Sequence, residues 1–145
     1  MTILAALGLL FSGLLAGEEF IVRYGVQPAL SGLDDHSHLR ARKALVARMR
    51  WVVPAIMLPT VLAGAVIAVA EPSVLRWLGL AVLVAFLLFS FLGTVPINIR
   101  VNDWDVENPP ADWKRLVARW EVIDVFRSSA AIVAFGLFLA AVLFE

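Results

Sequence analysis

The chain contains no cysteine, and this absence removes several kinds of chemistry at once. Disulfide bonds, thiolate-bound zinc, cysteine-ligated iron–sulfur clusters and covalently attached haem are all excluded. Histidine is scarce: the two present, His36 and His38, lie outside the long apolar stretches. The formal net charge is zero at pH 7, so no overall electrostatic field favours nucleic acid as a partner.

Charged residues are also few, at 17% of the chain, whereas hydrophobic residues make up 61%. Soluble domains average roughly 45–50% apolar residues, and a soluble domain of this size could not bury the excess. Four apolar stretches, at about 3–24, 51–70, 74–97 and 125–144, each approach the ~20 residues that cross a bilayer core of ~30 Å. Because a backbone in lipid must satisfy its own hydrogen bonds, the sequence predicts an all-α fold. We expect one domain over residues 1–145, a bundle of four transmembrane helices.

The first apolar stretch has a second interpretation, a cleaved signal peptide. Such a peptide carries basic residues ahead of its apolar run, and none precede this one. We therefore expect a membrane helix at this position.

The basic residues are distributed unevenly between the two sides of the predicted membrane. Nine lie in two long connectors, 27–50 and 98–119, and the other side has only Arg76. The nine are Arg40, Arg42, Lys43, Arg48, Arg50, Arg100, Lys114, Arg115 and Arg119. The positive-inside rule then predicts a multi-pass protein of the cell membrane, with both long connectors cytoplasmic and both termini outside.

Helices two and four are expected to begin before the membrane, as amphipathic cytoplasmic extensions. The stretch "HLRARKALVARMRW", residues 38–51, is a basic amphipathic segment with Ser37 as its expected N-cap. The stretch "ADWKRLVARW", residues 111–120, should run on into the fourth span. Basic segments of this kind attract anionic headgroups, so membrane lipid is an expected partner.

Small residues mark one face of the first helix. In "GLLAG", Gly13 and Gly17 are four residues apart, a spacing that lets a second helix approach closely. Packing inside the bundle is the interpretation that we favour. A homo-oligomer, or a larger membrane complex, stays open as the alternative.

Charged residues interrupt the ends of two spans. The fourth span reaches ~20 residues only if it extends back through Arg127 towards Asp124, and the first span must include Glu18 and Glu19. The predicted topology brings eight polar residues to one level: Glu18, Glu19, Arg23, Asn98, Arg100, Glu121, Asp124 and Arg127. Charges at such depth are costly unless they pair, face the interior or serve a site. Glu19 and Arg23, at i and i+4, are expected to pair.

This cluster has two interpretations. It is either a set of salt bridges that fastens the first helix to the fourth, or a polar pocket that opens towards the cytoplasmic leaflet. Four acids and three bases exceed what fastening requires, so we favour the pocket. Glu121 and Asp124 have the spacing of a Glu-x-x-His iron motif without the histidine, and oxygen ligands alone hold iron poorly. We therefore expect no metal and no cofactor. Ion transport is disfavoured because the polar residues crowd one side.

Three segments resemble the anthrone oxygenase-like family of small four-helix membrane proteins. They are "TVPIN" at 94–98, "WEVIDVFRS" at 120–128 with Trp113 ahead of it, and "AGEEFIVRYGVQPAL" at 16–30. Members typically show an N-x-P-x-N-like motif at the end of helix three and a W-x-x-x-H-x-x-R-T-like motif at the start of helix four. Here Thr94 replaces the leading Asn and Asp124 stands where His is usual.

The resemblance implies oxidation of anthrones, which are hydrophobic aromatic molecules, by molecular oxygen without an evident cofactor. On this interpretation Asp124 is the base, Arg127 or Arg23 stabilises the enolate, and Asn98 orients a carbonyl. The expected catalytic residues are Asp124, Arg127 and Asn98, and the expected substrate-binding residues are Glu18, Glu19, Arg23, Arg100, Trp113, Trp120 and Glu121. The alternative is a non-enzymatic accessory subunit or a lipid- or quinone-binding protein. An enzyme should have a cavity at this level, whereas salt bridges should fill the space in an accessory protein.

Overall fold

The computed structural model describes residues 2–145, and within that range it consists of helices and connecting segments without any strand. The elements are α1 (Ile3–Ile21), η1 (Val22–Val26), α2 (Gln27–Ser31), α3 (Asp35–Ala70), α4 (Val74–Phe89), η2 (Ser90–Thr94), α5 (Val95–Asn102) and α6 (Trp113–Phe144). They join into four continuous helices, 3–31, 35–70, 74–102 and 113–144, each long and apolar enough to cross a membrane. The predicted all-α bundle of four such helices is confirmed.

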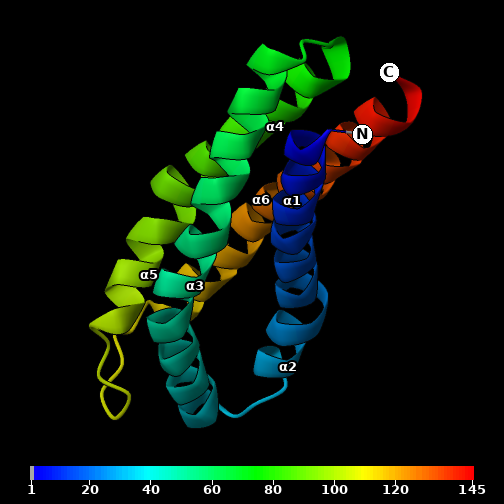
Figure 1. The fold of residues 1–145 in the computed structure, drawn as a ribbon. Coiled ribbons are helices and arrows are strands. Elements are labelled where there is room, and N and C mark those ends of the chain that lie inside the picture. Colours follow the sequence, from blue (N-terminus) through cyan, green and yellow to red (C-terminus); the bar gives the residue numbers. More distant parts are fainter. Residues whose placement is uncertain (1) are drawn as a thin grey trace.

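Both described ends of the chain lie at one end of the bundle, together with the α3–α4 turn (Figure 1). There the Thr2 hydroxyl donates a hydrogen bond of 2.8 Å to the Glu71 carboxylate. The short 32–34 connection and the 103–112 loop lie at the other end, which we call the loop end (Figure 1). Each long helix packs against two others: α6 against α1 and α4, and α3 against the same two.

The two long helices differ in how they begin. The Asp34 carboxylate caps α3 by accepting a 3.0 Å hydrogen bond from the Ser37 backbone N–H. The prediction of Ser37 as N-cap is therefore wrong: Ser37 is the donor, and the cap lies three residues earlier. The same hydrogen bond lowers the pKa of the exposed Asp34 carboxyl. Helix α6 starts at Trp113 and runs unbroken to Phe144, so the fourth span does begin in the preceding extension.

The first and third long helices each contain one π-helical turn, η1 and η2. A π turn inserts an extra residue and changes the face that the following helix presents. Across η1 the buried positions accordingly step by five, from Val22 to Gln27. Such turns are frequent at functional sites. Both contain polar residues: Arg23 lies in η1, and Ser90 and Thr94 lie in η2.

The interior has three layers along the bundle axis. An apolar cluster at the loop end contains Val22, Leu39, Val46, Ile97, Val101, Trp104, Trp113, Leu116, Val117 and Trp120. A second apolar cluster, farther into the bundle, contains Leu15, Met57, Leu83, Phe86, Ala131, Ala134 and Phe138. Between them the buried polar side chains of α1, η2 and α6 are Glu19, Ser90, Thr94, Asp124, Arg127 and Ser128, which we call the polar layer. Helix α3 adds no buried polar side chain between Val46 and Met57.

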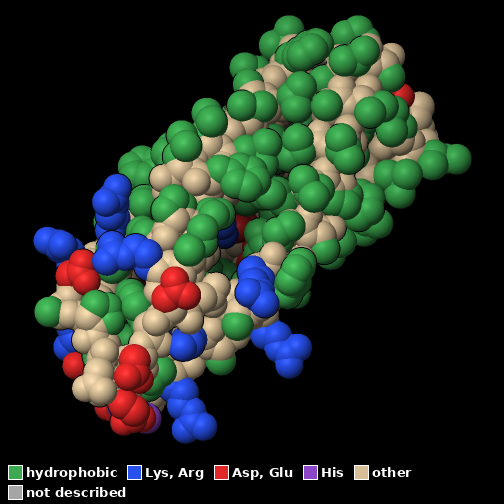
Figure 2. All heavy atoms as spheres, turned by 90° about the vertical axis from the view of Figure 1, so that its left-hand side faces the viewer, with side chains coloured by type: hydrophobic (Ala, Val, Ile, Leu, Met, Phe, Trp, Pro, Cys, Tyr) green, Lys and Arg blue, Asp and Glu red, His purple; other side chains and the backbone are tan. Residues whose placement is uncertain are grey.

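The outer surface has an apolar part and a charged part. Figure 2 shows hydrophobic side chains over most of the visible face away from the loop end, and Lys, Arg, Asp and Glu gathered at the loop end. The exposed apolar residues include Ile3, Leu62, Val69, Leu92 and Phe144, each at least 66% exposed. Lipid is the medium in which such a surface is stable.

The small residues of α1 face different surroundings. A Cβ atom added at Gly8 would lie 2.3 Å from Ile67 of α3, and one at Gly13 would lie 3.3 Å from the Phe135 ring of α6. These two glycines therefore permit close packing inside the bundle. Gly17 is exposed and has nothing within 4 Å of such a Cβ.

Gly93 brings the η2 segment close to α6, and its replacement should loosen that contact. A Cβ there would lie 2.6 Å from Ile123 Cγ2, a stiff β-branched group. We expect Gly93→Ala to destabilise the protein by about 1–3 kcal/mol through overpacking, as measured by thermal unfolding in detergent. Gly136→Ala is the control, because Gly136 has nothing within 4 Å. Equal midpoints for the two variants would contradict this packing.

Candidate functional site

One buried guanidinium organises the polar layer. Arg127 donates from Nη2 to the Glu19 carboxylate of α1, and its Nη1 lies 3.5 Å from Thr94 Oγ1 of η2. Its Nε lies 3.4 Å from Oδ1 of Asp124, one turn earlier on α6. The group also lies over the Phe86 ring of α4, 5.4 Å from the centroid. A single cation therefore joins the first, third and fourth long helices.

Arg23 does not form the expected ion pair with Glu19. Its Nη1 donates 2.9 Å to Ser129 Oγ and 3.3 Å to Ser128 Oγ on α6. Glu19 is completely buried and faces Arg127 instead. The predicted pair is wrong because Arg23 lies in the π turn, where the side-chain spacing of a regular α-helix no longer holds.

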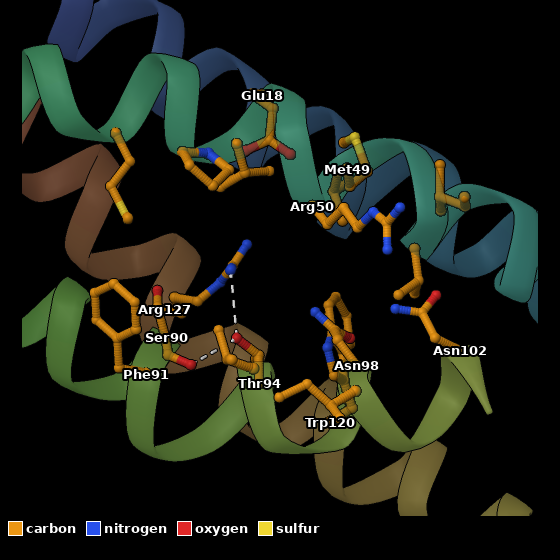
Figure 3. Close-up of a pocket in the computed structure, with 18 of the residues that line it drawn as sticks. Glu18, Met49, Arg50, Ser90, Phe91, Thr94, Asn98, Asn102, Trp120 and Arg127 are labelled. Atoms are coloured by element: carbon orange, nitrogen blue, oxygen red, sulfur yellow. Dashed lines mark hydrogen bonds between the residues drawn. The ribbon is translucent and has the colours of Figure 1, made fainter.

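A cavity of about 450 Å³ lies beside the polar layer, on the side of α3 (Figure 3). Its lining includes Glu18 from α1, Arg42 and Met57 from α3, Asn98 from α5, and Trp120 and Arg127 from α6. Four further lining residues, Arg50 and Leu58 of α3, Phe91 of η2 and Ile99 of α5, are exposed. The cavity therefore opens at the side of the bundle, between α3 and the η2–α5 segment.

The cavity brings together four of the residues predicted from sequence, Glu18, Asn98, Trp120 and Arg127. Figure 3 shows Glu18 on one side of the space, with Arg127, Asn98 and Trp120 across from it. The Glu18 Oε2 atom and the Trp120 Nε1–H group are buried and have no hydrogen-bond partner among residues 2–145. Two residues of the cavity wall therefore each contain a buried polar atom without a hydrogen-bond partner.

A second, smaller cleft of about 320 Å³ is lined by three other charged residues of the predicted site. Arg23, Gln27, Glu121 and Asp124 line it, and Gln27 also lines the cavity. Asp124 is buried against Arg127, and its carboxylate does not line the cavity. Asp124 therefore lies in a different space from Glu18 and Asn98. Arg127 connects the two spaces, because it lines the cavity and lies against Asp124.

Three predicted substrate-binding residues line neither space. Arg100 is exposed and lies 3.5 Å from Asp112 at the loop end. Trp113 belongs to the loop-end cluster, where its ring meets His38 edge-on at 5.4 Å. Glu19 is the buried partner of Arg127. No group of three or more His, Asp or Glu side chains in residues 2–145 is arranged to hold a metal ion.

Arg42 is a site residue that sequence reasoning placed among the surface basic residues. The structure buries it in the wall of the cavity, where its Nη2 donates 2.7 Å to Gln27 Oε1 and its Nε donates 3.1 Å to His38 Nε2. The sequence spacing does indicate this burial, because Arg42 follows Leu39 by three residues and precedes Val46 by four. That spacing puts it on the apolar stripe of its helix.

Comparison with known protein families gives a match, and it covers the central part of the chain. A family model described as anthrone oxygenase matches residues 43–137, that is 95 of the 145 residues. The match runs from α3 to the middle of α6, and so includes the η2–α5 wall of the cavity and the polar residues of α6. Searches of the curated proteins and of the solved structures gave no match.

Removal of one partner from the buried ion pair between Arg127 and Glu19 should destabilise the fold more than removal of both partners. We expect Arg127→Met to cost about 3–5 kcal/mol, because it leaves the buried Glu19 carboxylate without its cation. The double variant Glu19→Gln with Arg127→Met should recover part of the loss, as measured by unfolding in detergent, because the Asp124 carboxylate still lacks its cation. Arg115→Met is the control, since Arg115 is exposed and lies 3.5 Å from Asp112. Additive losses in the double variant would contradict the pairing.

Proposed function

The chain belongs to the anthrone oxygenase family, and from this we propose that it oxidises a hydrophobic, anthrone-like aromatic molecule with molecular oxygen in the cavity beside Arg127. The observation that carries the proposal is the composition of the cavity wall. A largely apolar space of about 450 Å³ is lined by one carboxylate, Glu18, and by guanidinium and carboxamide groups that include Arg127 and Asn98. Its volume is within the range of about 300–1,000 Å³ found for small-molecule sites.

The proposed reaction begins with proton transfer. The Glu18 carboxylate removes a proton from the benzylic CH₂ of the substrate, and the C–H electron pair becomes that of an enolate. Arg127 stabilises the enolate oxygen, and the Asn98 amide donates to the same carbonyl group. This step needs an acceptor beside the cavity, and Glu18 lines the cavity and has an Oε2 atom without a hydrogen-bond partner among residues 2–145.

Oxygen then reacts with the enolate. The carbon forms a bond to O₂, and the resulting peroxide takes back the proton held by Glu18. The hydroperoxide loses water as its O–O bond breaks and the remaining C–H proton leaves, so that a C=O bond forms. In sum, one CH₂ group and one O₂ give one C=O group and one water.

Asp124 has a different part in this proposal from the one expected from the sequence. Its carboxylate faces the Nε side of Arg127 and the smaller cleft. We propose that Asp124 fixes the guanidinium in place, while Glu18 exchanges the proton. The Asp that stands in place of the family's usual His is then the partner of Arg127, and Glu18 is the acid that lines the cavity.

The side opening supports a second candidate function. A quinone- or lipid-binding protein would admit its ligand between α3 and α5, where Leu58, Phe91 and Ile99 are exposed. Such a protein would use the same cavity and would bind without turnover. The unfilled cavity disfavours the third interpretation, in which salt bridges occupy this space.

Oxygen uptake on addition of a simple anthrone to the protein in nanodiscs tests the reaction. Uptake should exceed that of empty discs, which report spontaneous oxidation, and Glu18→Gln should reduce the excess at least about a hundredfold. Asp124→Asn should reduce it less, and Glu107→Gln, in the exposed loop, should have no effect. Full activity in Glu18→Gln together with none in Asp124→Asn would identify Asp124 as the base.

We also propose that the loop end is cytoplasmic, because the basic residues of the two connectors gather there. Cysteine labelling tests this orientation, and because the chain contains no cysteine of its own, only the introduced cysteine can react. In cells that express the chain, a membrane-impermeant maleimide should label Glu145→Cys and leave Asn108→Cys unlabelled until the cells are lysed. The reverse pattern would invert the orientation.

A further inference from the structure

Arg42 carries a buried charge that its protein partners neutralise incompletely. Its side chain is 3% exposed. Its two hydrogen bonds go to neutral groups, the Gln27 amide oxygen at 2.7 Å and the His38 ring nitrogen at 3.1 Å. The one carboxylate of residues 2–145 within 4.0 Å belongs to Glu121, at 3.9 Å, and that side chain is 39% exposed. A buried cation so placed is stabilised by an anion that hydrogen-bonds to it.

A free donor accompanies this cation at the same end of the cavity. The Arg42 guanidinium lies over the Trp120 ring, 5.5 Å from its centroid, and both residues line the cavity. The Trp120 Nε1–H is buried without a partner among residues 2–145. Since an indole N–H can only donate, it requires an acceptor that the described residues do not supply.

The cavity is polar at one end and apolar at the other. Figure 3 shows Asn98, Asn102 and Trp120 at one end, Phe91 at the other, and Arg127 between them. Trp120 and Arg127 are seven residues apart on α6, or about 10 Å along the helix axis. This separation is comparable to the length of three fused six-membered rings, so one ligand can reach from Arg127 to Trp120.

We propose that Arg42 and Trp120 form a subsite for a carboxylate carried by the ligand, which is therefore a hydrophobic aromatic acid rather than a neutral aromatic molecule. The carboxylate accepts hydrogen bonds from the Arg42 guanidinium and from Trp120 Nε1–H. The ring system extends past Arg127, and its far end lies against Phe91 and Met57. This inference rests on the proposed function for the location of the reacting group, and it adds the chemical class of the ligand.

Binding without turnover tests the subsite. Anthraquinone-2-carboxylate and its neutral carboxamide are already oxidised, so their affinities report recognition even if the chain proves not to be an oxygenase. In neutral phosphatidylcholine nanodiscs, measured by calorimetry, the carboxylate should bind the wild-type protein at least tenfold more tightly than the carboxamide. Equal affinities would overturn the proposal, and would leave oxygen uptake with a neutral anthrone as a separate question.

Three variants locate the effect. Arg42→Gln should abolish the preference for the carboxylate, and Arg40→Gln should retain it, because Arg40 is exposed on the same helix and its loss changes the net charge equally. Trp120→Phe keeps an aromatic ring and removes only the N–H, so it should weaken carboxylate binding several-fold with little effect on the carboxamide. If Arg42→Gln fails to fold, the Trp120→Phe comparison still decides. The subsite would be overturned if Trp120→Phe and Arg42→Gln both kept the wild-type preference for the carboxylate over the carboxamide. It would also be overturned if Arg40→Gln lost this preference as fully as Arg42→Gln.

A last arm distinguishes the aromatic acid from an anionic lipid headgroup. The carboxylate should retain its affinity within a few-fold in nanodiscs that contain phosphatidylglycerol. Displacement of the probe by this lipid in the wild-type protein, but not in Arg42→Gln, would identify a lipid as the occupant and would overturn the aromatic acid.

Discussion

The bundle depends on one buried cation, Arg127, whose charge must be balanced inside an otherwise apolar structure. Glu19 supplies the partner from α1 and Asp124 supplies a second acid from α6 itself. Because charges at this depth are costly unless they pair, these groups fix how α1 and α6 meet, and the contact of Arg127 with Thr94 adds η2. Apolar clusters above and below hold the polar layer at one level. Helix α3 contributes no buried polar group at this level, and the cavity lies on its side of the polar layer.

The same arrangement connects the fold with chemistry. A guanidinium held from several sides keeps its position when a ligand enters, and a preorganised charge is the kind of group that stabilises a developing anion. Glu18 lies next to Glu19 in sequence, yet it faces the cavity. One adjacent pair of acids therefore supplies both the structural partner of Arg127 and the acceptor in the proposed site.

Much of this could be predicted from the sequence, for identifiable reasons. Hydropathy alone gives the four spans, because lipid imposes a length and a composition on each helix. The level of the charged residues follows from the topology. Which side chains meet does not follow from hydropathy or topology, because the π turns η1 and η2 shift the helix faces. Arg23 therefore meets the serines of α6 and not Glu19, and Asp124 and Glu18 line different spaces. The burial of Arg42 was readable from its place on an apolar stripe.

The central claim is that the space between α3 and α5 holds an aromatic ligand against Arg127. An experimental structure of the protein in nanodiscs with anthraquinone-2-carboxylate tests it most directly. The ligand density should lie in this cavity, with its ring system beside Arg127 and Glu18. Density in the cleft lined by Arg23 and Asp124, or only on the outer surface, would contradict the account.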